Sequence, residues 1–282
     1  MSFLLQVVRI TIPYALAALG GALSERGGVI NIALEGTLLV GAFGGAVGAY
    51  YTHNALLGLL CGIGAGAALQ LVHGLACVRW KADQIVSGLA ANLLALGATR
   101  FFLKLCFDST ANSPRIAAWR TSAPFLIMAL AAAFLAHGLL YGTRFGLRLR
   151  ACGEHPEAAR TLGVQVARVR LAAVALAGAL AGLGGVWLAF DQHKFVDNMS
   201  AGRGYVALAA MIFGKWRPLP ACAACLLFGL AEAAQIGLQA SGIGLPTQLV
   251  QMLPYLMTIL ALTGGGGRAR GPAALGTPYE AE

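Results

Sequence analysis

Apolar residues form long runs separated by short polar segments along almost the whole chain. A helix needs about 20 apolar residues to cross the hydrocarbon core of a bilayer, which is roughly 30 Å thick. The pattern therefore predicts an all-α, polytopic transmembrane helix bundle with eight to ten spans. The candidate spans are residues 10–24, 36–51, 55–78, 84–104, 122–142, 171–190, 203–215, 219–238 and 247–263.

The second and seventh of these runs are short for a complete span, so we expect broken or partly inserted helices there. Glycine-rich stretches near 20–48 and 178–204 lie in the two halves of the chain, as in transporters built from an internal inverted repeat with broken helices. Glycines spaced four residues apart predict close helix packing in lipid. Such pairs are Gly41/Gly45, Gly44/Gly48, Gly58/Gly62, Gly62/Gly66 and Gly178/Gly182.

Basic residues between the runs predict the orientation of the bundle. Segment 143–170 carries six arginines against two glutamates, so the positive-inside rule makes it the main cytoplasmic loop. With nine spans, the other basic loops also fall inside, which places the N-terminus outside and the C-terminus in the cytoplasm. We expect a transmembrane domain over 1–263 and a disordered cytoplasmic tail over 264–282, which is rich in Gly, Ala and Pro.

Composition supports a membrane protein. The chain is 58% hydrophobic and only 11% charged, whereas about a quarter of the residues in soluble domains are charged. The net charge of +9 lies between the apolar runs, which argues against nucleic-acid binding. Cys222 and Cys225 form a C-x-x-C without a second pair at metal spacing, so no metal site is expected. His73 and His137 lie inside apolar runs and read as hydrogen-bonded packing residues.

The loop from Gly153 to Gly163 has the features of a short helix. Pro156 suits a first helical position, which needs no backbone donor, and Glu157 suits the positive end of the helix dipole. Gly163 is a plausible stop signal, and Ala158 and Ala159 offer a smooth surface for another protein. From these features alone, an ordinary solvated loop helix is an equally good interpretation.

Residues 157–163 also match the pattern E-A-A-x-x-x-G. This pattern resembles the coupling loop of ABC-importer permeases, a small cytoplasmic helix that docks into a groove on the ATPase subunit. The ATPase-coupling loop that the resemblance implies comprises Gly153, Glu154, His155, Pro156, Glu157, Ala158, Ala159, Arg160 and Gly163.

Three further stretches resemble one branch of these permeases, the branched-chain amino acid, ribose and nucleoside family. They are residues 23–36 (LSERGGVINIALEG), 81–94 (KADQIVSGLAANLL) and 202–216 (GRGYVALAAMIFGKW). The second is most similar to the nucleoside permeases. The resemblance implies alternating-access import of nucleosides across the bacterial inner membrane. It also implies three partners: an ABC ATPase, a second permease in a heterodimer, and an extracytoplasmic substrate-binding lipoprotein.

The chain is not expected to be an enzyme. It contains no G-x-x-x-x-G-K-[ST] sequence, so it lacks a phosphate-binding loop of that type. It is expected to hold no cofactor of its own, and the implied ATP and Mg²⁺ belong to the partner ATPase.

Polar residues inside the apolar runs are candidates for the substrate pathway, because a polar group within a membrane is costly. Most are neutral, which suits a neutral polar solute such as a nucleoside. Each could instead form only a hydrogen bond to a neighbouring helix. The candidates are Asn31, Glu35, Gln84, Ser87, Asn92 and Glu232.

Other functions stay open at this stage. A permease for simple sugars or branched-chain amino acids would share the same signatures. An ion-coupled secondary transporter would need the same spans and would use an intramembrane carboxylate such as Glu35 or Glu232 as its ion site. An outer loop with Asp191, His193 and Asp197 reads as a solvated surface rather than a metal or catalytic cluster.

Overall fold

A computed structural model describes residues 3–119, 121–240, 252 and 270–279. Within them the chain is all-α, apart from an isolated bridge between Asn112 and Val196, which confirms the predicted fold class. The helices are α1 (Phe3–Arg26), α2 (Leu34–Thr52), α3 (Ala55–Val78), α4 (Gln84–Phe107), α5 (Ala123–Gly142), α6 (Arg144–Glu154), α7 (Pro156–Thr161), α8 (Val166–Gln192), α9 (Arg203–Phe213) and α10 (Pro218–Ala240).

Each predicted run up to residue 238 has a corresponding helix, and the third run, 55–78, matches the bounds of α3. Six described helices (α1, α3, α4, α5, α8 and α10) are long and apolar enough to cross a membrane. The two runs predicted to be short became α2, with 19 residues, and α9, with only 11. The predicted run 247–263 lies outside the described residues.

Helices α1 and α8 form the centre of the bundle. In their most apolar windows 61% and 67% of the residues are buried, against 28% for the peripheral helix α4. Glycines let α8 approach α2 and α3 closely: a Cβ added to Gly66 would lie 2.6 Å from the Gly178 carbonyl oxygen and 2.6 Å from the Gly182 Cα. The predicted role of these glycine pairs is therefore confirmed.

Side-chain caps start several helices where the apolar runs begin. Asn54 accepts a hydrogen bond from the Leu56 amide at 2.8 Å at the start of α3. Asp83 accepts from the Ile85 and Val86 amides at the start of α4, at 2.9 Å each. These caps supply acceptors for backbone donors that the helix itself leaves unpaired.

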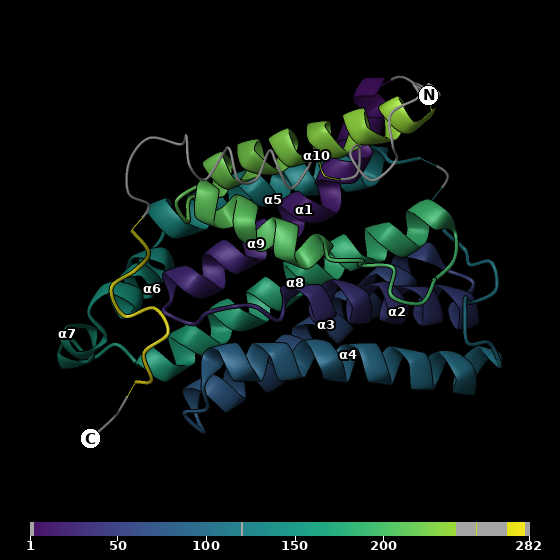
Figure 1. Cartoon of the computed structure of the whole chain (residues 1–282). Coiled ribbons are helices and arrows are strands. Elements are labelled where there is room, and N and C mark those ends of the chain that lie inside the picture. The colour runs from purple at the N-terminus through teal and green to yellow at the C-terminus, as the bar shows by residue number, and fades with distance from the viewer. Residues whose placement is uncertain (1–2, 120, 241–251, 253–269, 280–282) are drawn as a thin grey trace.

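Figure 1 shows α6, α7 and residues 270–279 at one end of the bundle, which we call the α7 end. The predicted disordered tail differs from the structure over 270–279. There Ala274 is buried, and its amide donates to the Gly153 carbonyl oxygen at 2.8 Å. Glycine and proline do not prevent an ordered path when neighbouring segments satisfy the backbone in this way.

Candidate functional site

The short helix expected near Glu157 is present as α7. Pro156 occupies its first turn, as predicted. At its other end, Gly163 has a φ of +79° and donates to the Arg160 carbonyl oxygen at 2.8 Å, while the Val164 amide donates to the Ala159 carbonyl oxygen at 3.1 Å. This is the Schellman arrangement, in which glycine adopts the left-handed conformation most readily.

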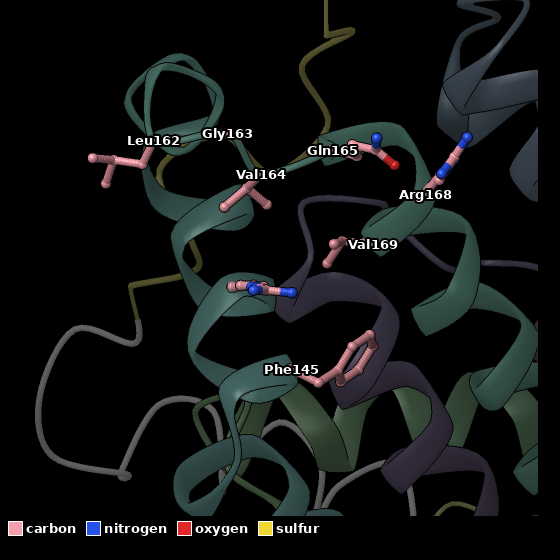
Figure 2. A pocket seen from close by; sticks show the side chains of 8 residues that line it. Phe145, Leu162, Gly163, Val164, Gln165, Arg168 and Val169 are labelled. Atoms are coloured by element: carbon pink, nitrogen blue, oxygen red, sulfur yellow. The ribbon is translucent and has the colours of Figure 1, made fainter.

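Helix α7 projects from the bundle and presents a small surface. Glu157 and Ala158 are exposed, and the Leu162 side chain, just after the helix, is 85% exposed. Ala159 alone turns inward, onto Cys152 and Val166. A hollow of about 350 Å³ lies beside this projection. Figure 2 shows the side chains that line it. Its lining residues are Phe145, Arg148, Leu162, Gly163, Val164, Gln165, Arg168 and Val169.

The thiol of Cys152, beneath α7, should react slowly with maleimides. Burial raises its pKa, and the nearby Arg170 guanidinium opposes that shift only in part. Because the thiolate is the reactive form, labelling should require a more alkaline pH than an exposed thiol requires. We expect severalfold slower labelling at pH 7.5 than for an Ala158→Cys control, measured by mass spectrometry of the two peptides. Equal rates would show that Cys152 is accessible.

The end of α6 is fixed to the end of α1. Gly153 has no room for a Cβ, because the Arg26 carbonyl oxygen lies against it. The Arg26 guanidinium lies 4.0 Å from the Glu154 carboxylate and donates to the Trp216 carbonyl oxygen at 3.0 Å. Arg26 thus connects the segment that carries α7 with the turn that follows α9.

Residues 27–33, between α1 and α2, form a non-helical break held by side chains from other helices. The Ile30 amide donates to Gln84 Oε1 at 2.7 Å, and the Ile30 carbonyl oxygen lies 3.0 Å from His73 Nε2. Because a carbonyl only accepts, His73 Nε2 carries the proton. Its Nδ1 then accepts from the Ser87 hydroxyl at 2.9 Å. The predicted packing role of His73 is confirmed.

Asn92 of α4 holds the start of α2. Its side-chain oxygen accepts from the Gly36 amide at 2.8 Å. Its side-chain nitrogen donates to the Ile32 carbonyl oxygen at 3.0 Å and lies 3.1 Å from the Tyr205 hydroxyl on α9. One amide side chain therefore joins the break, α2 and α9.

Glu35 of α2 caps α9, the short helix. Its two carboxylate oxygens accept from the amides of Gly202 at 2.8 Å and Gly204 at 2.7 Å. A carboxylate at a helix N-terminus meets the positive end of the dipole and pairs the free donors of the first turn. Gly204 has no room for a Cβ beside the Glu35 backbone, and Gly202 has a left-handed φ of +85°, which together explain the G-R-G sequence at this point.

A second carboxylate, Glu25, joins the other end of α9 to the break. It accepts from Trp216 Nε1 at 2.6 Å and from the Asn31 amide at 3.2 Å. Lys215 and Trp216 both have a φ of +56°, a left-handed conformation that costs about 1–2 kcal/mol for a residue with a side chain. The contacts from Glu25 and Arg26 hold this strained turn in place.

A fully buried amide pair lies behind the break. Gln70 of α3 donates to the Asn31 side-chain oxygen at 2.8 Å and to the Thr37 hydroxyl at 2.9 Å. Asn31 Nδ2 and Gln70 Oε1 have no hydrogen-bond partner within the described part of the chain. Asn31 therefore belongs to the packed interior rather than to an exposed surface.

Glu232 does not join this group. Its carboxylate accepts from the Tyr14 hydroxyl and lies 3.7 Å from the Arg203 guanidinium. The structure therefore separates the six predicted pathway residues. Asn31, Glu35, Gln84, Ser87 and Asn92 surround the break, whereas Glu232 lies between α1, α9 and α10.

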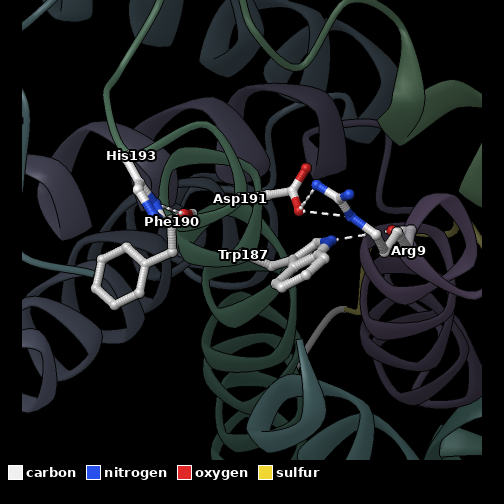
Figure 3. Close-up of polar contacts among 5 residues, drawn as sticks. All are labelled: Arg9, Trp187, Phe190, Asp191 and His193. Atoms are coloured by element: carbon white, nitrogen blue, oxygen red, sulfur yellow. Dashed lines mark hydrogen bonds and ion pairs between the residues drawn. The ribbon is translucent and has the colours of Figure 1, made fainter. Parts of the chain in front are cut away.

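At the opposite end of the bundle, charged residues that read as a solvated loop form ion pairs. Figure 3 shows Asp191 paired with Arg9, whose carbonyl oxygen accepts from Trp187 Nε1 at 3.0 Å. Asp197 pairs with Arg100 at 3.0 Å. These bonds join α1 and α4, at the end of the bundle opposite α7, to the two ends of the α8–α9 connection.

The three stretches that resemble permease signatures thus meet in space. Residues 23–36 contribute the break and both carboxylates, residues 81–94 contribute Gln84, Ser87 and Asn92, and residues 202–216 contribute α9 with Trp216. Sequence reasoning missed Glu25, His73 and Trp216 as members of the site, although Glu25 and Trp216 lie within the quoted stretches. Broken helices that meet inside a membrane bundle are typical of transport proteins, and this is the class that the arrangement indicates.

Comparison with known proteins agrees. Residues 3–262 match the family described as branched-chain amino acid transport system / permease component, and the chain belongs to this family. It is 40% identical to the guanosine ABC transporter permease protein NupQ of Bacillus subtilis, with 95% of this chain and 92% of that protein aligned.

Two other relatives are similar over comparable lengths. The nucleoside ABC transporter permease protein NupC of Lactococcus lactis is 38% identical, over 95% of this chain and 93% of its own. The putative glucose ABC transporter permease protein TsgC13 of Haloferax volcanii is 34% identical, over 93% and 92%. No solved structure matches the chain significantly. A multi-pass membrane permease subunit is therefore the established class.

Proposed function

We propose that this chain is the permease subunit of an ABC importer that carries nucleosides across the bacterial inner membrane. The observation that carries the proposal is the meeting of the three signature stretches around the break 27–33 and α9, in a chain 40% and 38% identical to permeases of guanosine and nucleoside transporters. This places an interrupted backbone, held by neutral amides and two carboxylates, inside the bundle.

The proposed orientation places the α7 end, the C-terminus and segment 143–170 in the cytoplasm. The arginines of that segment, among them Arg148 and Arg168 around the hollow of Figure 2, support this side under the positive-inside rule. An ABC ATPase binds the coupling loop of residues 153–163 around α7, and this partner holds the ATP and Mg²⁺. A second permease and a substrate-binding lipoprotein complete the importer.

The cargo path is proposed to run past Glu35, Asn92 and Tyr205. These three are partly exposed and lie together where α2, α4 and α9 meet, whereas Asn31 and Gln84 are buried. Ser87 and the two buried residues contribute through hydrogen bonds that fix the break and the residues around it. Glu232 contributes from the side through Arg203, at the first turn of α9.

Of the two alternative functions, one has support from a relative and the other is disfavoured by the contacts of the carboxylates. A permease for simple sugars or branched-chain amino acids is favoured by the likeness to a putative glucose transporter permease. An ion-coupled secondary transporter needs a carboxylate available to bind an ion or a proton. Glu35 instead accepts two backbone amides, and Glu232 is paired with Arg203, which disfavours this reading.

The coupling loop can be tested by reversing one charge on α7. Glu157→Lys places a cation at the positive end of the helix dipole and alters an exposed docking surface. We expect the tagged variant to lose the ATPase in a detergent pull-down but to keep the second permease. Asp108→Lys, an equal charge change at the opposite end with a 96% exposed side chain, should keep both. Retention of the ATPase by Glu157→Lys would contradict the docking proposal.

Cargo is tested by uptake of labelled guanosine in vesicles that contain the complete importer. Competition by unlabelled nucleosides, and none by glucose or leucine, is the expected result. Competition by glucose or leucine alone would replace the nucleoside proposal by the corresponding alternative. Uptake that persists without ATP and follows an ion gradient would establish secondary transport.

A further inference from the structure

Residues 270–279, which we call the C-terminal strap, lie across the α7 end of the bundle (Figure 1). They follow a non-helical path, yet they contact segments that are far apart in the sequence. On one side the Ala274 amide donates to the Gly153 carbonyl oxygen at 2.8 Å, and the Ala273 amide donates to the Glu154 carboxylate at 3.1 Å. The strap is thus bonded to the residues that lead into α7.

On its other side the strap contacts the helix breaks. The Gly276 amide donates to the Gly28 carbonyl oxygen at 3.3 Å, and the Ile30 side chain lies against Gly276. Gly271 packs against the Trp216 ring at the end of α9. The strap therefore contacts both non-helical segments that the carboxylate of Glu25 holds together, the break 27–33 and the turn at Trp216.

Arg170, at the start of α8, fastens the strap to the bundle. Its side chain is 1% exposed. The guanidinium donates to the carbonyl oxygens of Cys152 at 3.2 Å and Thr277 at 3.4 Å, and it lies 5.9 Å from the centre of the Tyr279 ring. Gly28 packs directly against it. One cation thus joins α6, α8, the break and the strap.

Burying the Arg170 guanidinium costs free energy that packing alone would not require. No carboxylate of the described residues pairs with Arg170, and its Nε has no hydrogen-bond partner among them. Burying a cation without a full set of partners is unfavourable, and an apolar side chain of similar volume would pack there at lower cost. Two carbonyl groups and an aromatic face from separate segments compensate only while those segments stay together.

We propose that the C-terminal strap and Arg170 transmit movement of α7 to the break 27–33 and to the end of α9. The proposal rests on the proposed function, because it requires an ATPase that moves α7. Arg170 and Tyr279 are positioning residues: Arg170 holds the strap, and Tyr279 packs on the cluster of Cys152, Ala159 and Val166 beneath α7. The strap then carries a displacement of α7 both to the break 27–33 and to the end of α9.

The test uses the complete importer, purified and reconstituted with its ATPase, second permease and binding protein. Tyr279→Ala removes the ring, and Arg170→Met removes the cation while keeping an apolar stem. Tyr279→Phe keeps the ring, and Pro278→Ala changes an exposed neighbour. The measurements are ATPase content of the complex, basal ATP hydrolysis, its stimulation by loaded binding protein, and uptake.

We expect Tyr279→Ala and Arg170→Met to keep the ATPase in the complex and to keep basal hydrolysis. Stimulation and uptake should both fall by about tenfold, within the range typical of coupling between distant sites. Tyr279→Phe and Pro278→Ala should match the wild type. In Tyr279→Ala, maleimide labelling of Cys152 should accelerate, because the ring no longer packs against the cluster of Cys152, Ala159 and Val166.

Other outcomes would overturn the proposal. Unchanged stimulation in Tyr279→Ala, with Cys152 labelling accelerated, would show that the strap can detach without affecting coupling. Loss of the ATPase from the complex would make the strap a docking element instead. A wild-type chain that purifies without any ATPase would refute the proposed function itself, and that result is visible before any variant is compared.

Discussion

Replacing Gly66 with leucine is expected to prevent the chain from accumulating as a folded bundle, whereas Gly64→Leu should leave it folded. The two glycines lie two residues apart on α3 and differ in what surrounds them. A Cβ at Gly66 would meet backbone atoms of Gly178 and Gly182 at 2.6 Å, while a Cβ at Gly64 meets nothing within 4 Å.

The size of the effect follows from how membrane helices associate. Lipid tails are as apolar as the side chains, so close backbone packing supplies much of the stability. Overpacking a core costs about 1–3 kcal/mol when side chains can move, and here the obstacle is backbone, which cannot. The central contact between α3 and α8 would have to open.

Both variants can be measured by the fraction of monodisperse protein after extraction in mild detergent, and by its thermal aggregation midpoint. Gly64→Leu adds the same side chain to an exposed position of the same helix and thus controls for hydrophobicity and expression. Equal behaviour of the two variants would show that the close approach of α3 to α8 does not limit stability.

The apolar pattern predicted the helices well, because lipid imposes a simple rule on length and composition. The short runs that became α2 and α9 were also visible as departures from that rule. The ordered strap was not, because its stability comes from Gly153, Gly28 and Arg170, which are more than 90 residues away in the chain. The composition of a segment does not show which distant residues will form hydrogen bonds with it.

At the candidate site, too, the sequence pattern identified residues but not the distant contacts that they make. Glu35 and Glu232 were identified as unusual because each is a carboxylate within an apolar run. Glu25 and Trp216 lie within the signature stretches 23–36 and 202–216, but their own roles were not predicted. The roles depend on contacts across 167 to 218 residues, such as Glu35 with Gly202 and Glu232 with Tyr14. Pattern reasoning identified which residues needed an explanation, and the tertiary contacts supplied it.

The polar residues of the site share one task, which is to complete hydrogen bonds that a broken helix leaves unpaired. Irregular backbone at membrane depth is tolerated only where protein groups or water satisfy it. Gln84, His73 and Asn92 do so for the break, and Glu35 does so for α9. A moving gate can be built from such segments, because side-chain bonds can exchange without unwinding a helix.

Glu35→Leu is therefore expected to abolish uptake, while Glu35→Gln should retain part of it. The leucine leaves the amides of Gly202 and Gly204 without their acceptors, and a hydrogen bond to a charged group is worth about 1.5–3 kcal/mol. The glutamine side chain keeps one carbonyl acceptor but loses the charge that favours the positive end of α9.

Hydrogen exchange separates this effect from general unfolding. In Glu35→Leu, exchange should accelerate at the first turn of α9, over residues 202–206, and should stay unchanged in α3, because the hydrogen bonds of the Glu35 carboxylate go to α9. Asp108→Asn, which neutralises a carboxylate whose side chain is 96% exposed and lies away from α9, controls for loss of charge. Lost uptake with an unchanged first turn of α9 would instead mean that Glu35 contacts the cargo directly, and capping would then be its lesser role.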